Sequence, residues 1–458
     1  MLKNKKISYS LTLIPLVIIF GLFIWLFTVI FEGEKPQITL DPLPEFLSKS
    51  QNFTLQISDR KRGLKTLKVS YDQGGRDVII FEKRFPFKGL FNKEGLRSFK
   101  KEIEVNPTAL HLAQGRVDLN VSVRDYSRRG GGDGNLGIIK HKMTVDTIPP
   151  SIRALSRMHN INLGGSGLVV YRASSDTEES GVYVNNNFFR GFPAGEKQEE
   201  GLHLAYFAVP HDSNLDPSIY LWAKDKAENT TNATFYYHVR RKRFSNSKLN
   251  ISDKFLSRVL PYFSFYDLSQ EETNIDKYIK INNDLRKEDN DTFYNLMQNT
   301  DLSQIWEGTW TRLKNAATMA KYADKRGYYY KGEKIDEQTH LGIDLASLAN
   351  SPVTAANNGI ITFAERNGIY GLTVMIDHGQ GLASLYGHMS SIEATAGQEV
   401  KKGDVIGHTG QTGLAGGDHL HFSILVGGVF VEPIEWWDSH WIEDNIYKKL
   451  ELIKQKKK

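Results

Sequence analysis

The amino-acid sequence predicts a mostly β protein. It should begin with one transmembrane helix, continue through two β-sandwich modules and a short helical segment, and end in a β domain. Three observations support this prediction. Residues 7–31 carry no charged side chain and are dominated by Leu, Ile, Val and Phe. Short alternating runs separated by turn residues recur from about residue 36 to residue 242. A helical period replaces them between about residues 250 and 300.

The composition narrows the class of protein. A chain of 458 residues has room for two to four domains, and 40% hydrophobic with 24% charged residues is ordinary for globular proteins. The formal net charge is only +5, and no stripe of Arg with interleaved aromatic residues occurs, so we expect no nucleic-acid partner. The chain has no cysteine, which excludes disulfides and thiolate metal sites.

The first segment, residues 1–35, is predicted to be a cytoplasmic tip and a transmembrane anchor. Its apolar stretch is long enough to cross a bilayer. Lysines precede it and glutamates follow it, so the remainder of the chain should lie outside the cytoplasm; these residues are Lys3, Lys5, Lys6, Glu32 and Glu34. A cleaved signal peptide is the alternative. The length of the stretch and the absence of a small-x-small cleavage site in residues 29–36 favour an uncleaved anchor.

Two β-sandwich modules are predicted next, over residues 36–146 and 147–242. Residues 117–123 are typical of the alternating strands, and turn clusters such as residues 129–134 separate them. The boundary is placed at Val145-Asp146-Thr147-Ile148-Pro149-Pro150, where two prolines end strand pairing. This joint resembles that between tandem bacterial immunoglobulin-like modules. We expect the modules to serve as a stalk, with contact to a wall polymer or partner as the alternative.

A helical linker is predicted over residues 243–304. Ser269 and Glu272 are spaced as a capping box, and a second short helix is expected at residues 292–297. These helices would pack on the last domain or cover its groove. The last domain, residues 305–440, should open with a hairpin over residues 312–330. Residues 441–458 are predicted to form a basic, solvated helical tail.

Paired histidines and an aspartate mark the last domain. His419 and His421 are two apart in a run too short for a helix, so we expect a strand with both imidazoles on one face. His340 and Asp344 are four apart and should also share a strand face, with Gly342 leaving room for an ion. Two histidines and an aspartate, with one open position for water, are the ligand set of a catalytic zinc site.

Three motifs in this region resemble those of the lysostaphin/LytM-type zinc metalloendopeptidases, which cut peptidoglycan peptides. They are HLGID from His340 to Asp344, YGH ending at His388, and HLHF from His419 to Phe422. The resemblance implies an antiparallel-β peptidase domain that binds Zn²⁺. It further implies that His340, Asp344 and His421 are the metal ligands and that His388 and His419 are catalytic. In that assignment His419 is the general base and His388 stabilises the oxyanion.

The resemblance also implies a function. The expected protein is a membrane-anchored zinc metalloendopeptidase that hydrolyses peptide cross-links or stem peptides of bacterial peptidoglycan. It would sit in the bacterial inner (cytoplasmic) membrane with a single pass and with its C-terminal domains on the extracytoplasmic side. Peptidoglycan is the expected partner, and cell-wall or division proteins remain open as others. The alternative is a non-catalytic LytM-type adaptor that activates a cell-wall amidase.

Overall fold

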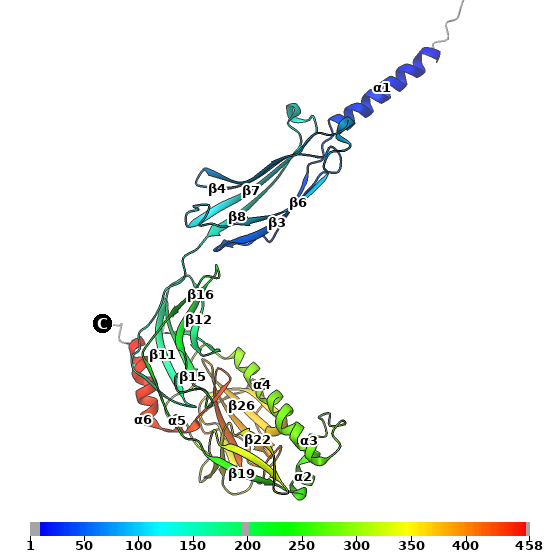
Figure 1. The fold of residues 1–458 in the computed structure, drawn as a ribbon. Coiled ribbons are helices and arrows are strands. Elements are labelled where there is room, and N and C mark those ends of the chain that lie inside the picture. The colour runs from blue at the N-terminus through cyan, green and yellow to red at the C-terminus, as the bar shows by residue number, and fades with distance from the viewer. Residues whose placement is uncertain (1–9, 195–200, 455–458) are drawn as a thin grey trace, which may run out of the picture. The chain divides into compact units, whose positions relative to one another are not determined.

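The computed structural model describes residues 10–194 and 201–454 and divides into two compact units (Figure 1). The first unit is Met1–Pro149 with Lys226–Asn229, and the second is Pro150–Asp225 with Thr230–Lys458. The prediction of a mostly β chain with one N-terminal apolar helix and a β domain at the C-terminus is confirmed.

Helix α1, Ser10–Ile30, is the predicted apolar segment. By length and composition its residues Leu13–Ile30 could cross a membrane, and none of them is buried inside the protein. Lys3, Lys5 and Lys6, on which the predicted orientation depends, lie outside the described residues.

Two sheets of the first unit share one apolar core, which gives the predicted two-layer sandwich. Along β7 the residues Val117, Leu119, Val121 and Val123 alternate inward, because successive strand residues point to opposite faces. The likeness to immunoglobulin-like modules stays a prediction. One sheet has the order β1-β3-β6 and the other β2-β8-β7-β4-β5, with bounds Gln37–Asp41 (β1), Phe46–Leu47 (β2), Gln51–Ser58 (β3), Leu64–Gln73 (β4), Arg76–Arg84 (β5), Ser98–Val105 (β6), Gly115–Asp125 (β7) and Leu136–Val145 (β8).

The second unit begins with two four-stranded sheets and a parallel pair. The sheets have the orders β14-β15-β11-β9 and β13-β12-β16-β17, and β10 pairs with β18. The bounds are Ile152–Ala154 (β9), His159–Asn162 (β10), Ser166–Ala173 (β11), Thr177–Val184 (β12), Asn187–Arg190 (β13), Phe192–Pro193 (β14), Leu202–Ala208 (β15), Ile219–Asp225 (β16), Thr230–Ala233 (β17) and Tyr237–Arg240 (β18).

These sheets are not a free stalk, because they share a core with the C-terminal domain. Tyr206 on β15 packs against Trp436 with ring centroids 6.4 Å apart. The carboxylate of Glu435 accepts hydrogen bonds from Asn162 Nδ2 at 2.8 Å and from the Ser166 backbone N at 3.0 Å. Burial of apolar surface between the two parts therefore stabilises them together.

The C-terminal helices also correct the prediction of a solvated tail. The last two of them, over residues 443–454, contact β11 (Figure 1). Ile446 is buried, and Lys449 Nζ donates to the Leu168 carbonyl at 2.9 Å. The helices are Pro433–Trp437 (α5), Ser439–Ile442 (α6), Glu443–Tyr447 (η7, a π-helix) and Lys448–Lys454 (α7).

The helical segment begins with Asp253–Val259 (α2) and continues through Leu260–Phe263 (η3), Asn274–Lys280 (α3), Ile281–Leu285 (η4, a π-helix), Arg286–Leu296 (α4) and Met297–Asn299 (η5). The predicted capping box at Ser269 and Glu272 is wrong. The box forms at Thr273 and Asp276, whose side chain and backbone bond reciprocally at the start of α3. The second helix begins at Arg286, earlier than predicted.

An antiparallel sheet forms the centre of the C-terminal domain, with the order β20-β23-β31-β27-β26-β25-β29 and β32 paired to β31. The predicted hairpin over residues 312–330 is wrong, since β20 pairs with β23 while β21 forms a hairpin with β22. The bounds are Asn246–Ile251 (β19), Ala317–Ala320 (β20), Lys325–Tyr330 (β21), Glu333–Thr339 (β22), Ile343–Ala346 (β23), Pro352–Thr354 (β24), Gly359–Asn367 (β25), Gly368–Tyr370 (η6), Gly371–Gly379 (β26), Leu382–Met389 (β27), Ser391–Ile392 (β28), Glu399–Val400 (β29), Val405–His408 (β30), Leu420–Val426 (β31) and Val429–Val431 (β32).

Candidate metal centre

Three neighbouring strands bring the predicted site residues together. Asp344 on β23 lies opposite His421 on β31, and Gly387 on β27 lies on the other side of His421. His388 follows Gly387 on β27, and His419 directly precedes β31. Cross-strand neighbours in an antiparallel pair have Cβ atoms about 4.5–5.5 Å apart, so the sheet itself sets these side chains within reach of one another.

His340 reaches the site by a different route from the predicted one. It does not share a strand with Asp344, because β22 ends at Thr339 and β23 begins at Ile343. The connection passes close to β31 at Gly342. A Cβ added there would lie 2.4 Å from Ser423 Oγ and 2.6 Å from His421 Nε2, so only glycine fits.

Three side-chain atoms converge at the centre of this arrangement. His340 Nε2 lies 2.9 Å from Asp344 Oδ1 and 3.0 Å from His421 Nδ1, and the last two atoms are 3.1 Å apart. All three residues are buried. The set contains two imidazoles and one carboxylate, as the sequence predicts for the ligands.

In each of these three side chains, the second nitrogen or oxygen, which does not face the centre, has a partner of its own. His340 Nδ1 lies 3.0 Å from the Lys321 carbonyl, which only accepts, so Nδ1 carries the proton and Nε2 the lone pair. His421 Nε2 lies 3.0 Å from Ser423 Oγ. Asp344 Oδ2 accepts from Arg326 at 2.8 Å. Partners of this kind orient metal ligands and fix their tautomers.

The residues present therefore fit zinc. His340 Nε2 and Asp344 Oδ1 are acceptors that face each other, and His421 Nδ1 becomes a third when the Ser423 hydroxyl donates to Nε2; such a cluster is stabilised by a cation. The edges of a zinc tetrahedron with bonds of about 2.0–2.1 Å are about 3.3 Å long, close to the separations of the three atoms. Imidazole and carboxylate ligands suit this ion.

His388 and His419 form a second pair at the edge of the centre, with ring centroids 4.8 Å apart. His419 Nε2 lies 3.5 Å from Asp344 Oδ1, farther than the three converging atoms are from one another. Both rings use Nδ1 to contact a main-chain carbonyl at 2.8 Å, that of Thr412 for His388 and that of Gly417 for His419. Each ring therefore presents Nε2 to the site.

The backbone at His388 is unusual for a residue other than glycine. Its φ is 62°, in the left-handed region. Gly387 and His388 together face a single residue of β26 where the register with β27 shifts, which makes this a β-bulge. The bulge re-aims the imidazole toward His419 and His421, whose rings lie 4.8 Å and 5.8 Å from it.

Burial dominates the electrostatics of the site. It lowers the pKa of His421 to about 4 and lowers the pKa of His388 well below its usual value. Burial also lowers the pKa of His419, but the hydrogen bond and charge of Asp344 outweigh it and raise that pKa overall. Burial alone would raise the pKa of Asp344, yet the charge and hydrogen bonds of the three neighbouring imidazoles, His340, His419 and His421, together outweigh burial and hold that pKa well below its usual value.

Sequence reasoning missed Arg326, the outer partner of Asp344. It lies on β21, and its guanidinium forms ion pairs with Asp344 at 2.8 Å and Asp324 at 3.5 Å. No motif surrounds it. The alternation along β21, which places Arg326 and Tyr328 on the same side, is the one pattern in the sequence that bears on it.

A pocket of about 540 Å³ opens onto the centre. Its walls come partly from the helical segment and β19, including Ile251, Phe255 and Tyr278. Tyr328 also lines it and packs on Tyr278 with ring centroids 6.0 Å apart, so it serves both as a core residue and as part of the groove. Arg258 on α2 donates to the carbonyls of Ala415 and Gly416 at 3.2 and 3.0 Å. The helices therefore both pack on the domain and form one wall of its groove.

This region is similar in sequence to known proteins. Residues 338–433, which contain all five site residues, match the model of peptidase family M23. The DD-carboxypeptidase/endopeptidase Mpg of Neisseria meningitidis is 43% identical over 95 residues, which are 21% of this chain and 22% of the relative. Stage II sporulation protein Q of Bacillus subtilis is 33% identical over 102 residues, 21% of this chain and 36% of the relative. The chain thus spans between about a fifth and a third of the length of these relatives.

Among solved structures, the catalytic domain of the antimicrobial peptidase lysostaphin from Staphylococcus simulans is similar, with 27% sequence identity and a TM-score of 0.25. The match covers 29% of this chain and 98% of that one.

Proposed function

Since residues 338–433 form a peptidase family M23 domain, we propose that this domain is a zinc-dependent endopeptidase. Its proposed substrates are the peptide cross-links or stem peptides of bacterial peptidoglycan. The observation that carries the proposal is the convergence of His340, Asp344 and His421 beside two further imidazoles in one pocket. Relatives named as endopeptidases match the same residues, which supports the substrate class.

His340, Asp344 and His421 would hold the ion, which when bound activates water and polarises the scissile carbonyl. His419 Nε2 takes a proton from the water and later returns it to the leaving amine. Its Nδ1–H stays on the Gly417 carbonyl throughout, so the ring does not rotate.

His388 hydrogen-bonds the oxygen on which negative charge develops. Its Nδ1–H is engaged by the Thr412 carbonyl, so Nε2 must itself carry a proton to donate. Burial holds the pKa of His388 well below its usual value, so this ring is neutral at rest. Nε2 can donate only after it takes a proton from solvent in the open pocket, which becomes favourable as the negative charge of the substrate forms beside it, so the interaction is specific to the transition state.

The test is digestion of purified peptidoglycan by the full-length protein in detergent, with mass analysis of the released fragments. The zinc-loaded wild type should release peptides cut within stems or cross-links. His340→Ala should release none. His440→Ala changes a histidine of the same unit whose side chain is 96% exposed, so it should cut normally. No fragments from the zinc-loaded wild type would contradict the proposal.

The second candidate is a non-catalytic adaptor that activates a cell-wall amidase. One observation favours it: α2, α3 and β19 already form one wall of the groove. The complete set of five polar side chains favours hydrolysis instead. Metal analysis separates the two, because an adaptor needs no stoichiometric zinc.

We further propose that α1 is an uncleaved, single-pass anchor in the cytoplasmic membrane, with the C-terminal units on the extracytoplasmic side. The support is its uncharged, unburied surface and the acidic residues that follow it.

A further inference from the structure

Three carboxylates are buried together in the first unit, where the chain leaves α1. Glu32, Asp59 and Asp125 are 7%, 3% and 0% exposed. They come from three separate segments: the chain just after α1, the residue after β3 and the last residue of β7. Each offers one oxygen, and these oxygens all lie within 4.8 Å of one another.

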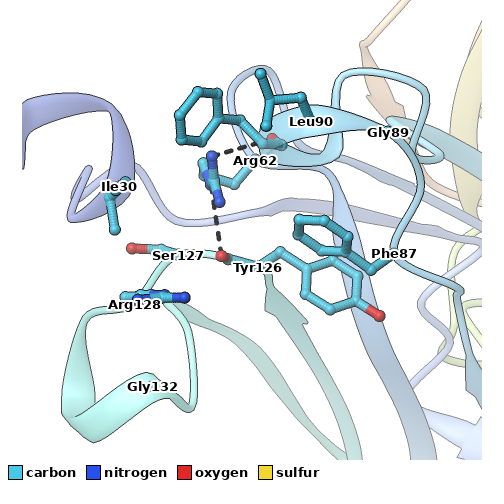
Figure 2. Close-up of a pocket in the computed structure, with 10 residues that line it drawn as sticks. Ile30, Arg62, Phe87, Gly89, Leu90, Tyr126, Ser127, Arg128 and Gly132 are labelled. Atoms are coloured by element: carbon cyan, nitrogen blue, oxygen red, sulfur yellow. Dashed lines mark hydrogen bonds between the residues drawn. The ribbon is translucent and has the colours of Figure 1, made fainter. Parts of the chain in front are cut away.

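The charge of Arg62 acts on all three carboxylates, but it forms no ion-pair contact with them. Within residues 10–194 and 201–454, no Lys, Arg or His forms an ion pair with any of the three. Arg62 lies nearby, but its guanidinium donates to the main-chain carbonyls of Phe91 at 3.0 Å and Tyr126 at 3.4 Å (Figure 2). Buried charges that lack a partner are costly, and proteins pair them or place them on metals.

Asp59 points most directly to a missing ligand. Its Oδ1 accepts three backbone N–H groups, from Lys61 at 3.1 Å, Arg62 at 2.7 Å and Gly63 at 2.5 Å. These bonds fix the side chain. Its Oδ2 is fully buried and has no hydrogen-bond partner. A buried carboxylate oxygen without a partner loses its hydration and gains nothing in return, so a ligand is expected there.

The other two carboxylates are held just as firmly. Asn135 Nδ2 lies 3.0 Å from Glu32 Oε1 and 2.8 Å from Asp125 Oδ2. Asp125 Oδ1 accepts from the backbone N of Ser127 at 2.9 Å and of Asn135 at 2.7 Å. Gly134, with φ of 95°, allows the loop to turn back this closely onto Asp125.

We propose that Glu32, Asp59 and Asp125 bind one Ca²⁺ ion. All of the candidate ligand atoms are oxygens, which select hard cations. Two oxygens bound to the same calcium ion with bonds of about 2.3–2.6 Å lie at most about 5.2 Å apart, so the three carboxylates are close enough to share one ion. Mg²⁺ demands a near-ideal octahedron and keeps several waters, whereas Ca²⁺ accepts irregular ligands such as carboxylates from three separate segments, which favours calcium.

The proton affinities of the cluster agree with this geometry. Burial raises the pKa of Glu32 and of Asp59, and the charge of Asp125 raises both further. Without a cation these two carboxyls therefore bind protons more tightly than exposed carboxyls do, and a divalent ion would compete with those protons for the cluster.

The ion would hold the chain that leaves α1 against the first β module. Ser127 Oγ donates to the Glu32 carbonyl at 2.8 Å, and the Arg128 backbone N donates to the Ile30 carbonyl at 2.9 Å. The bound ion would be a third link, because the side chain of Glu32 is one of its ligands. Calcium binding thus joins the end of the helix to the loops after β3 and β7.

Calorimetric titration of the full-length, zinc-loaded protein with CaCl2 tests the proposal. We expect one calcium per chain, with Kd at or below the range of about 10⁻⁴–10⁻³ M typical of extracellular modules. Asp59→Asn keeps an oxygen for the three backbone N–H groups and should weaken binding at least tenfold. The matched control Asp133→Asn changes an exposed carboxylate in the same loop as Asn135 and should bind normally. Asp344→Asn should also bind normally, which separates this site from the metal centre.

Thermal unfolding is a second measurement, which still tests the proposal if Asp59→Asn changes the fold. With about 5 mM CaCl2, the wild-type unfolding midpoint should rise, because calcium binds only the folded state. Without calcium, Asp59→Asn should be at least as stable as wild type, since it removes one of three buried like charges; with calcium it should be less stable. A wild type that binds no calcium, an equal shift with MgCl2, or an Asp59→Asn variant that binds like wild type would each overturn the proposal.

Discussion

Replacing His419 by alanine should separate hydrolysis from metal binding. His419 Nε2 lies 3.5 Å from Asp344 Oδ1, whereas the three proposed ligand atoms lie 2.9–3.1 Å from one another. His419 thus borders the centre without completing it. The variant should keep stoichiometric zinc and lose turnover.

The size of the loss follows from the proposed role. Proton transfer by a positioned base contributes about 10²–10⁴-fold, which corresponds to about 2.7–5.4 kcal/mol of transition-state free energy. The fold should lose much less. The His419 side chain hydrogen-bonds the Gly417 carbonyl and contacts Asp344 more weakly at 3.5 Å, and a net loss of about 0.5–1.5 kcal/mol is typical for one hydrogen bond.

The assay pairs two measurements on the same sample: zinc per chain by elemental analysis, and the initial rate of peptide release from cross-linked peptidoglycan. His388→Ala should behave similarly, because an oxyanion donor contributes about 10²–10³-fold. His440→Ala, on the exposed surface, is the control. A His419→Ala variant that cuts at the wild-type rate would show that this histidine is a bystander. A variant that loses its zinc would make His419 a ligand, and the assignment of three ligands would be wrong.

Three further predictions concern groups around the site and the anchor. Arg326→Met should weaken zinc binding about 10–100-fold, because Asp344 loses its outer partner; an unchanged affinity in chelator competition would refute this. Burial raises the pKa of Asp289 to about 7, above its unfolded value of 3.8, so the folded state holds a proton that the unfolded state releases. This contribution to stability is complete below about pH 4 and is lost as the pH rises to about 7, at up to roughly 1.4 kcal/mol per pH unit. Asp289→Asn should flatten this slope in urea unfolding at several pH values, and an unchanged slope would contradict the assignment. Finally, protease added to spheroplasts should degrade residues 150–454; protection of these residues until the membrane is breached would reverse the proposed orientation.

The sequence was enough to predict which residues form the candidate site, but not the way the chain brings them together. Motif spacing predicted that His419 and His421 lie on one strand with both imidazoles on one face; His421 does lie on β31, while His419 directly precedes it. The same rule failed for His340 and Asp344. There the chain leaves β22 and enters β23 through Gly342, and only the packing of that glycine on β31 reveals the break. For Arg326 the sequence offered only the alternation along β21, which does not identify its partner, since its role depends on a contact between separate strands.

In the helical regions, too, local sequence patterns showed the elements but not their exact start or what they pack against. A helical period was visible around residues 250–300, but its start was misplaced because Thr273 and Asp276 form a capping box with aspartate in place of the usual Glu or Gln. The apolar stripe of the C-terminal tail, which includes Ile446, was also visible. Its partner face on β11 lies far away in the sequence, so local pattern could not show that the tail packs there.

The left-handed backbone at His388 is held in place by the imidazole that it carries. A side chain in this region costs about 1–3 kcal/mol relative to glycine, which adopts it freely. The His388 side chain is buried, and its Nδ1–H donates to the Thr412 carbonyl. His388→Gly would relieve the backbone strain, but it would empty a buried position and leave that carbonyl without its partner, so we expect it to fold less stably and to hydrolyse nothing. The imidazole that faces the metal centre therefore also keeps the strained bulge in shape.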